Sequence, residues 1–161
     1  MWNITLDGLI EGITANHPSL LTQAFADDLS ILQKGICYST IAYRINQGLA
    51  YTQDWCKRAG LKINPSKTDL ILFGYRKKAQ LPQFSFQGTI IPRKTEVKYL
   101  GVVIDNKLTW TAHCRERYKK AAAAMAVLRR FIGPRWGLSP RITLWLYTTM
   151  IRPIIDYGAI V

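Results

Sequence analysis

Two adjacent carboxylates, Asp27 and Asp28, are the residues of this chain best suited to chemistry. β-compatible runs at 19–26 and 29–33 flank them, so the pair is predicted to connect two strands at the tip of a hairpin. Mg²⁺ prefers oxygen ligands, and a few carboxylates together with substrate phosphates suffice for a phosphoryl-transfer site. An Asp-Asp pair in a turn is also common for structural reasons, because aspartate tolerates turn geometry and solvent. The pair therefore needs support from its context.

Further candidate residues follow residue 60. The segment G-L-K-I-N-P-S-K-T at 60–68 contains Lys67, and Y-L-G-V-V-I-D at 99–105 contains Tyr99, Leu100 and Gly101. One predicted helix then carries six bases, Arg115, Arg117, Lys119, Lys120, Arg129 and Arg130. Alanines between them would let this helix approach a duplex closely while the bases meet phosphates. Lys67, or any single base, could equally be an ordinary solvated side chain, although only Glu116 opposes the six.

Helices and short strands must position these residues. Apolar residues at helical spacing predict a helix over 2–14 and an amphipathic helix over 37–59, which ends at a Gly60 C-cap and covers the hairpin. Asn64 is best explained as a turn former ahead of Pro65. Strands are predicted at 68–73, 84–86, 89–91 and 97–104.

The last third of the chain is predicted to be helical. A helix over 110–131 is followed by the Gly133-Pro134 break and by a second helix with a Ser139 cap and Pro140 at its first position. Pro153 is expected to end or kink that helix before 154–161. Three tryptophans are expected to serve in packing: Trp110, Trp136 and Trp145. The fold class is thus α+β, with antiparallel strands and packed helices in 1–105 and an all-helical domain in 106–161.

Composition indicates a folded chain that is neither exported nor membrane-spanning. Of its 161 residues 48% are hydrophobic and 20% charged, enough to bury a core. The longest apolar run, residues 121–128, is far shorter than the ~20 residues that cross a bilayer, and no signal-peptide pattern opens the chain. Three cysteines without a C-x-x-C pair favour reduced thiols. We therefore expect a nuclear or cytoplasmic protein, not a secreted one.

Charge is distributed unevenly along the chain. Residues 1–56 carry a net charge of −3 and residues 57–161 one of +15, which together give the total of +12. A basic part beside carboxylates placed elsewhere favours a bound polyanion, with nucleic acid as the leading candidate. An anionic membrane surface or an acidic protein would satisfy the same bulk charge.

The order of the motifs identifies a family. Three segments follow one another in the chain: F-A-D-D at 25–28, residues 60–68, and residues 99–105 followed by Leu108, Trp110 and His113. In this order they resemble the last palm motifs and the primer-grip region of reverse transcriptases from non-LTR retrotransposons, especially the jockey-like elements of insects. The resemblance covers essentially the whole chain. It implies a partial polymerase palm in 1–105 and a basic, truncated thumb in 106–161.

The resemblance also implies roles for the candidate residues. Asp27 would bind the catalytic Mg²⁺, which Mn²⁺ could replace, Asp28 would support it, and Lys67 would face the phosphates of the incoming nucleotide. Tyr99, Leu100 and Gly101 would lie against the primer end, although a buried strand is the plain alternative. The six thumb bases would contact the duplex of RNA template and DNA primer. No catalytic role is expected for His113.

Departures from the family pattern limit the expected activity. The family's further metal-binding aspartate, its fingers and its P-Q-G segment all precede F-A-D-D, and an endonuclease domain is expected in the full-length protein. This chain is therefore expected to be a fragment that lacks one metal ligand and is inactive alone. Two hypotheses remain: an RNA-directed DNA polymerase by descent, using deoxynucleotides, or a non-catalytic basic module that binds nucleic acid.

Overall fold

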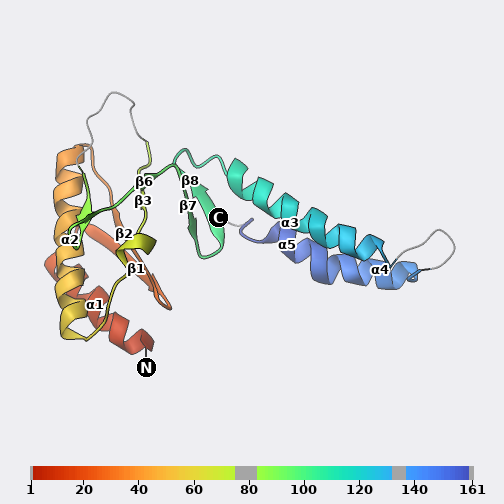
Figure 1. Ribbon diagram of the computed structural model, residues 1–161, viewed down its shortest axis with the longest axis horizontal. Coiled ribbons are helices and arrows are strands. Elements are labelled where there is room, and N and C mark those ends of the chain that lie inside the picture. The colour runs from red at the N-terminus through yellow and green to blue at the C-terminus, as the bar shows by residue number, and fades with distance from the viewer. Residues whose placement is uncertain (1, 75–82, 132–136, 160–161) are drawn as a thin grey trace. The chain divides into compact units, whose positions relative to one another are not determined.

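The computed structural model describes residues 2–74, 83–131 and 137–159. Helices and short strands alternate along it, which confirms the α+β class (Figure 1). The helical segments are α1 (Trp2–Asn16), α2 (Tyr38–Arg58), the 3₁₀ turn η1 (Pro65–Lys67), α3 (Thr111–Arg129), α4 (Pro140–Leu146), the π-helical η2 (Tyr147–Ile151) and α5 (Arg152–Asp156). Within these described ranges, none of the helices combines the length and apolar character needed to span a membrane.

All the strands are short and pair in twos. They are β1 (Leu20–Phe25), β2 (Asp28–Gln33), β3 (Leu70–Ile71), β4 (Ser85–Phe86), β5 (Thr89–Ile90), β6 (Arg93–Lys94), β7 (Glu96–Tyr99) and β8 (Val102–Asp105). The pairs are β1–β2, β3–β6, β4–β5 and β7–β8. The hairpins β1–β2, β4–β5 and β7–β8 each pack against a helix, which stabilises them because an isolated hairpin is marginal in water.

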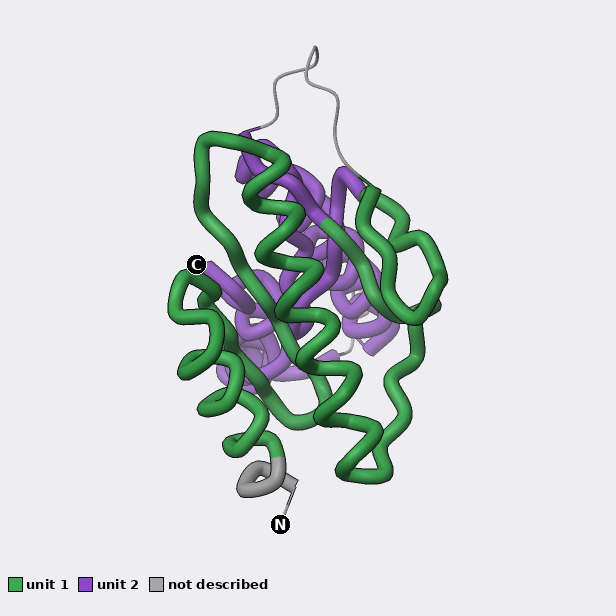
Figure 2. Tube along the Cα trace, turned by 90° about the vertical axis from the view of Figure 1, so that its left-hand side faces the viewer, with its two compact units in different colours: residues 1–70, 76–93 green, residues 71–75, 94–161 purple. Residues whose placement is uncertain are grey.

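The chain divides into two compact units (Figure 2). The first unit comprises residues 1–70 and 76–93, and the second comprises residues 71–75 and 94–161. Each unit has buried residues of its own. The proposed functional boundary after residue 105 remains a prediction.

In the first unit, α1 and α2 pack beside the β1–β2 hairpin (Figure 1). Leu9 and Ile13 of α1 and Leu20 of β1 are almost fully buried and form one core cluster. Gly48 of α2 permits this packing, since a Cβ at that position would lie 2.6 Å from Leu20 Cδ1. The long helix α2 thus holds the hairpin that carries the two aspartates.

A second cluster of the first unit lies on another side of α2. Ala42 of α2 packs with Phe84, Phe86 and Ile91 around the β4–β5 hairpin. With buried positions facing both clusters, α2 is the central helix of this unit. Its amphipathic pattern was visible in the sequence, whereas its second partner was not.

The second unit joins the β7–β8 hairpin to a helical pair. Helix α3 runs beside η2 and α5, and it also contacts β8 (Figure 1). Ile151 of η2 is 2% exposed and Ala121 of α3 is 6% exposed, so these two residues mark the interior of the pair. The small Ala121 side chain suits a close helix contact.

Local signals for turns and caps were read correctly. Gly60 follows the end of α2 with φ +70°, Asn64 caps η1 by accepting from the Ser66 amide, and Ser139 caps α4 by accepting from the Ile142 amide. The Gly133-Pro134 break lies outside the described residues. These confirmed features depend only on neighbours in sequence.

Three strand and helix boundaries were wrong. Residues 97–104 form a hairpin and not one strand, because Leu100 and Gly101 adopt φ values of +47° and +78°. Of the strand expected at 68–73, only the two residues of β3 are extended and paired. Of the two outcomes expected at Pro153, the end of the helix is wrong, because Pro153 lies in the first turn of α5, which follows the π-helical η2 directly.

Candidate active site and nucleic-acid interface

The carboxylates lie at the tip of the β1–β2 hairpin, one residue out of the predicted register. The two-residue turn is Ala26-Asp27, and Asp28 is already the first residue of β2, paired with Phe25. Ala26 takes φ +52° in the turn. Asp27 and Asp28 are both exposed. The expectation that both aspartates form the connection is therefore wrong for Asp28.

Asp28 lies on the outer face of this hairpin. Side chains of opposed residues share a face, and the exposed face continues from the Phe25–Asp28 pair to the Leu21–Leu32 pair. Leu21, Phe25 and Leu32 are 70%, 62% and 47% exposed. The opposite face, with Leu20, packs on the helices. Asp28 thus borders an apolar, open surface.

These two carboxylates fit part of a divalent-cation site. Two exposed carboxylates at adjacent positions offer the oxygen donors that Mg²⁺ prefers. Within the described residues, no three His, Cys, Asp or Glu side chains gather as a metal site would require. The Asp105 carboxylate accepts hydrogen bonds from its own loop, as described below. The described donor set is thus a partial one.

Lys67 ends the 3₁₀ turn η1 and is exposed. The turn is held by Asn64, whose Oδ1 accepts from the Ser66 amide at 3.0 Å and from the Ser66 hydroxyl at 2.7 Å. The Lys67 amide donates to the Asn64 carbonyl at 3.1 Å, but the Lys67 side chain makes no hydrogen bond or ion pair with the described part of the chain. Its ammonium group is therefore available to an anion, and the structural role expected for Asn64 is confirmed.

The segment Tyr99-Leu100-Gly101 forms the tip of the β7–β8 hairpin. Tyr99 pairs with Val102, and Leu100 and Gly101 form the two-residue turn. Positive φ at both turn residues is the pattern of a type I′ turn, whose twist matches that of the strands. The plain alternative of a continuous buried strand is thereby excluded.

The six bases, five on α3 and Arg130 at its C-cap, do not share one face. With 100° per residue, Arg115, Lys119, Arg129 and Arg130 fall within about 100° of one another around the helix axis. All four side chains are exposed, and none of these side chains makes a hydrogen bond or ion pair with the described residues. Ala122 and Ala126 lie between them on the same face. We call Arg115, Lys119, Arg129 and Arg130 the basic stripe.

The remaining two bases are engaged within the chain. Lys120 Nζ lies 2.7 Å from Glu116 Oε1, which also accepts from Lys98 Nζ at 3.2 Å. The hydrogen bond from Lys120, followed by that from Lys98, lowers the pKa of Glu116 to about 2. Arg117 points inward, donates to the Gly101 carbonyl and stacks on Tyr157. Of the six bases, four therefore face solvent and two are bonded to other residues of the chain.

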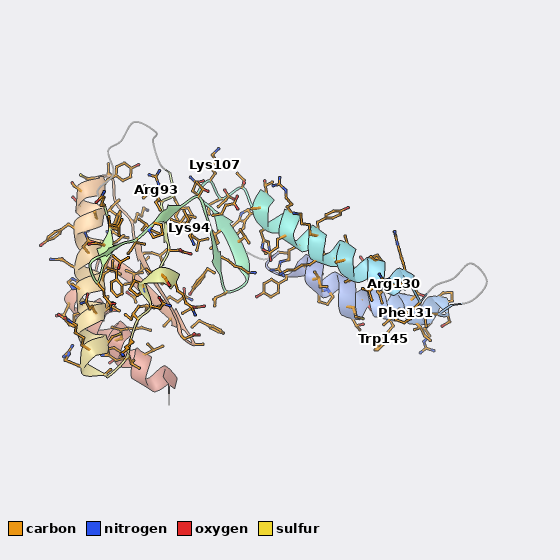
Figure 3. The ribbon with its side chains drawn as sticks, viewed as in Figure 1. Arg93, Lys94, Lys107, Arg130, Phe131 and Trp145 are labelled. Carbon is orange, nitrogen blue, oxygen red and sulfur yellow. The ribbon has the colours of Figure 1, made fainter. Side chains whose placement is uncertain are left out.

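Exposed aromatic side chains accompany the far end of the basic stripe. Figure 3 shows Arg130 and Phe131 at the end of α3, with Trp145 on α4 at the same end of the helical pair. Phe131 is 56% and Trp145 61% exposed. The packing role expected for Trp145 is therefore wrong, whereas Trp110 is half-buried and Trp136 lies outside the described residues.

Two buried polar residues that were not expected in the site help to hold the second unit together. His113 is 6% exposed; its Nδ1 accepts from the Val103 amide at 3.2 Å, and its Nε2 lies 2.9 Å from the Tyr157 carbonyl. Because Nδ1 accepts, Nε2 carries the proton and donates. His113 thus links β8, α3 and the end of α5.

The second such residue is Asp105, 8% exposed at the end of β8. Its carboxylate accepts from the amides of Lys107, Thr109 and Trp110 at 2.9–3.1 Å, and from the Thr109 hydroxyl at 3.1 Å. Burial raises its pKa, but the hydrogen bonds from Thr109, Lys107 and Trp110 outweigh burial and lower the pKa below its usual value. Asp105 shapes the loop that leads into α3.

Comparison with known proteins gives one family. Residues 1–104 match the family model described as reverse transcriptase (RNA-dependent DNA polymerase). The chain is 27% identical, over 89% of its length, to the "RNA-directed DNA polymerase from mobile element jockey" of Drosophila melanogaster. It is 28% identical, over 99% of its length, to the "Retrovirus-related Pol polyprotein from type-1 retrotransposable element R1" of Bradysia coprophila.

A third relative has the same coverage pattern. The "Probable RNA-directed DNA polymerase from transposon BS" of Drosophila melanogaster is 27% identical over 89% of this chain. The chain spans only about a sixth of each of these three relatives, 16% of their lengths. No solved structure matches the chain.

Proposed function

Because the chain belongs to the reverse transcriptase (RNA-dependent DNA polymerase) family, we propose that it is the part of a non-LTR retrotransposon polymerase that carries the palm aspartates and holds the template-primer duplex in its thumb. Its substrates would be an RNA template, a DNA primer and deoxynucleotides. The names of the jockey and BS relatives support this substrate class, and the short length that the chain shares with them limits the proposal to one part of the reaction.

The observation that carries the proposal is the basic stripe. Four exposed bases without internal partners lie on one face of α3, opposite the buried His113 and Ala121. Lys119 and Arg129 are ten residues apart, about 15 Å along the axis, and alanines lie between them. Small side chains would let the helix approach a groove while the bases at both ends reach phosphates.

Aromatic side chains extend this proposed surface. Phe131 and Trp145, exposed near Arg130, offer flat apolar faces on which bases can stack. Arg117 and Lys120 are not required for phosphate contact, since one is stacked on Tyr157 and the other is paired with Glu116. The nucleic-acid interface is thus proposed on the four bases of the stripe.

In the proposed site Asp27 and Asp28 would supply carboxylate oxygens to Mg²⁺, and Lys67 would meet the nucleotide phosphates. When bound, the ions would neutralise charge on the transferring phosphoryl group. Both aspartates are exposed, so the chain itself adds no burial that would strengthen the site. The partial donor set supports the expectation that polymerisation requires a further carboxylate.

Binding to an RNA–DNA hybrid duplex tests the proposal. The chain and its variant R115A/K119A/R129A/R130A should be titrated by fluorescence anisotropy at several salt concentrations. If each base of the stripe contacts one phosphate, the slope of log K against log salt should shrink by about 3.6 in the variant. An unchanged slope would refute the interface.

A matched control variant separates local contact from bulk charge. Lys34, Arg44, Lys57 and Arg58 are exposed bases of the first unit. Replacing these four by alanine changes the net charge by the same amount as replacing the stripe. The control is expected to keep most of the wild-type slope. Equal losses in both variants would show that net charge, and not the stripe, governs binding.

A non-catalytic nucleic-acid-binding module is the second candidate function. It is favoured by the lack, within the described residues, of three metal-ligating side chains in one place. Primer extension with Mg²⁺ and four deoxynucleotides discriminates the two functions. Extension that Asp27→Ala abolishes would show a complete site in this chain, whereas duplex binding without extension would favour the binding module.

A further inference from the structure

The tip of the β7–β8 hairpin is tied down by two side chains from other elements of the second unit. The Tyr157 hydroxyl donates to the Leu100 carbonyl at 2.8 Å, and an Nη of Arg117 donates to the Gly101 carbonyl at 2.5 Å. Each bond is made to one of the two residues of the turn. Both carbonyl groups of the turn are therefore fixed from outside the hairpin.

The two side chains also hold each other. The Arg117 guanidinium carbon lies 4.4 Å from the centre of the Tyr157 ring. A planar guanidinium stacked on an aromatic face keeps its orientation while it donates in its own plane. Arg117 Nε is buried without a hydrogen-bond partner, so this side chain is built into the structure and does not extend into solvent. We call Arg117 and Tyr157 the clamp.

Glycine at position 101 makes the clamp possible. A Cβ on Gly101 would lie 2.8 Å from the Tyr157 hydroxyl and 3.2 Å from its ring, closer than packed atoms approach. The φ of +78° also disfavours any other residue. Glycine at this position therefore serves both the turn and the clamp, and the group that approaches Gly101 closely is Tyr157.

We propose that Arg117 and Tyr157 are positioning residues, which set the Leu100-Gly101 turn against the primer end. The inference rests on the proposed function and on the family resemblance, which implies that this turn lies beside the primer terminus. The clamp acts through the turn and does not itself contact nucleic acid. It assigns Arg117 a function different from that of the basic stripe on the same helix.

Tyr157→Phe tests the clamp with little disturbance. It removes the hydroxyl that reaches Leu100 and keeps the ring under Arg117. Tyr118→Phe on the same unit is the matched control, because Tyr118 is 73% exposed. A second variant, Arg117→Lys, keeps the charge but loses the planar stack. Amide hydrogen exchange at Leu100, Gly101 and Val102 and the fluorescence of 2-aminopurine at the primer 3′ terminus are measured for each.

The clamp predicts a specific pattern of results. Tyr157→Phe and Arg117→Lys should speed exchange at the turn by roughly two- to tenfold, the worth of one hydrogen bond. The terminal 2-aminopurine response should be reduced, while overall duplex affinity, set by the stripe, stays within about twofold. Tyr118→Phe should change none of these quantities.

The opposite results separate the clamp from the proposed function. Unchanged exchange would show that the turn holds itself and would overturn the clamp. Faster exchange with an unchanged 2-aminopurine response would overturn its role toward the primer. A wild-type chain that does not bind the duplex would refute the proposed function, and the primer role with it, while exchange would still report whether the clamp holds the turn.

Discussion

Two neighbouring lysines of α3 should differ sharply in their contribution to duplex binding. Lys119 belongs to the basic stripe and has no partner within the described residues, whereas Lys120 is 2.7 Å from Glu116. Lys119→Ala and Lys120→Ala each remove one unit from the net charge of +12. The pair of variants thus compares position at constant charge.

The magnitude follows from counterion release. One phosphate contact contributes about 0.9 to the slope of log K against log salt, so Lys119→Ala should make the slope less negative by about 0.9. Between 50 and 200 mM salt, wild-type affinity should then fall about 3.5-fold more than that of the variant. Lys120→Ala should leave the slope nearly unchanged, because that charge is already balanced by Glu116.

The assay is anisotropy of a labelled RNA–DNA duplex at four or more salt concentrations. Glu116→Gln is a useful third variant, since it releases Lys120 and should make the slope more negative. Equal slopes for Lys119→Ala and Lys120→Ala would refute the reasoning. They would mean that the duplex responds to total charge and not to the face of α3.

Three further predictions concern the groups that hold the fold. His113→Ala should lower the free energy of unfolding by about 2–4 kcal/mol in a urea titration, because the Val103 amide and the Tyr157 carbonyl lose their partner; a loss under about 0.5 kcal/mol would contradict the observed bonding. Because the pKa of Asp105 is lowered in the folded state, its carboxylate adds stability that is fully present above the usual carboxyl pKa of about 3.9 and is lost as pH falls through the folded pKa. Asp105→Asn should therefore weaken the acid dependence of the melting temperature. An unchanged pH profile of the melting temperature would exclude this contribution. The hydrogen bond from Ser39, aided by the Thr40 amide, lowers the pKa of exposed Cys37 to about 7. Alkylation of Cys37, followed by mass spectrometry, should therefore reach half its maximal rate near pH 7, and Ser39→Ala should move that midpoint upward. An identical pH profile for the variant would show that Ser39 does not lower the pKa of Cys37.

The predicted caps and turns, which depend on residues adjacent in the sequence, are confirmed. Ser139 followed by Pro140 predicted the start of α4, Gly60 the end of α2, and Asn64 a turn. A side-chain cap or a left-handed glycine depends on a few adjacent residues, so no distant contact needs to be known. The order of the motifs likewise identified the family, which the match over residues 1–104 confirms.

The registers of the hairpins were harder to predict from the sequence than the caps and turns. The run 97–104 contains β-forming residues on both sides of Leu100-Gly101, and composition alone did not reveal that the chain reverses there. At the F-A-D-D segment a shift of one residue placed Asp28 in the strand, opposite Phe25. Such a slip moves each side chain to the other face, and the helices packed on one face select the register.

The sequence by itself determined the α+β class, the family, the aspartate hairpin and a helix carrying six bases. Only the tertiary structure decided which of those bases face outward. The alanine-rich α3 has no strong apolar stripe from which its buried side could be read, so its orientation depends on contacts made elsewhere. His113 fixes that orientation by bonding to Val103 and Tyr157, and Arg117 follows it inward to the clamp. A residue's function on this helix is therefore set by the surface against which the helix packs.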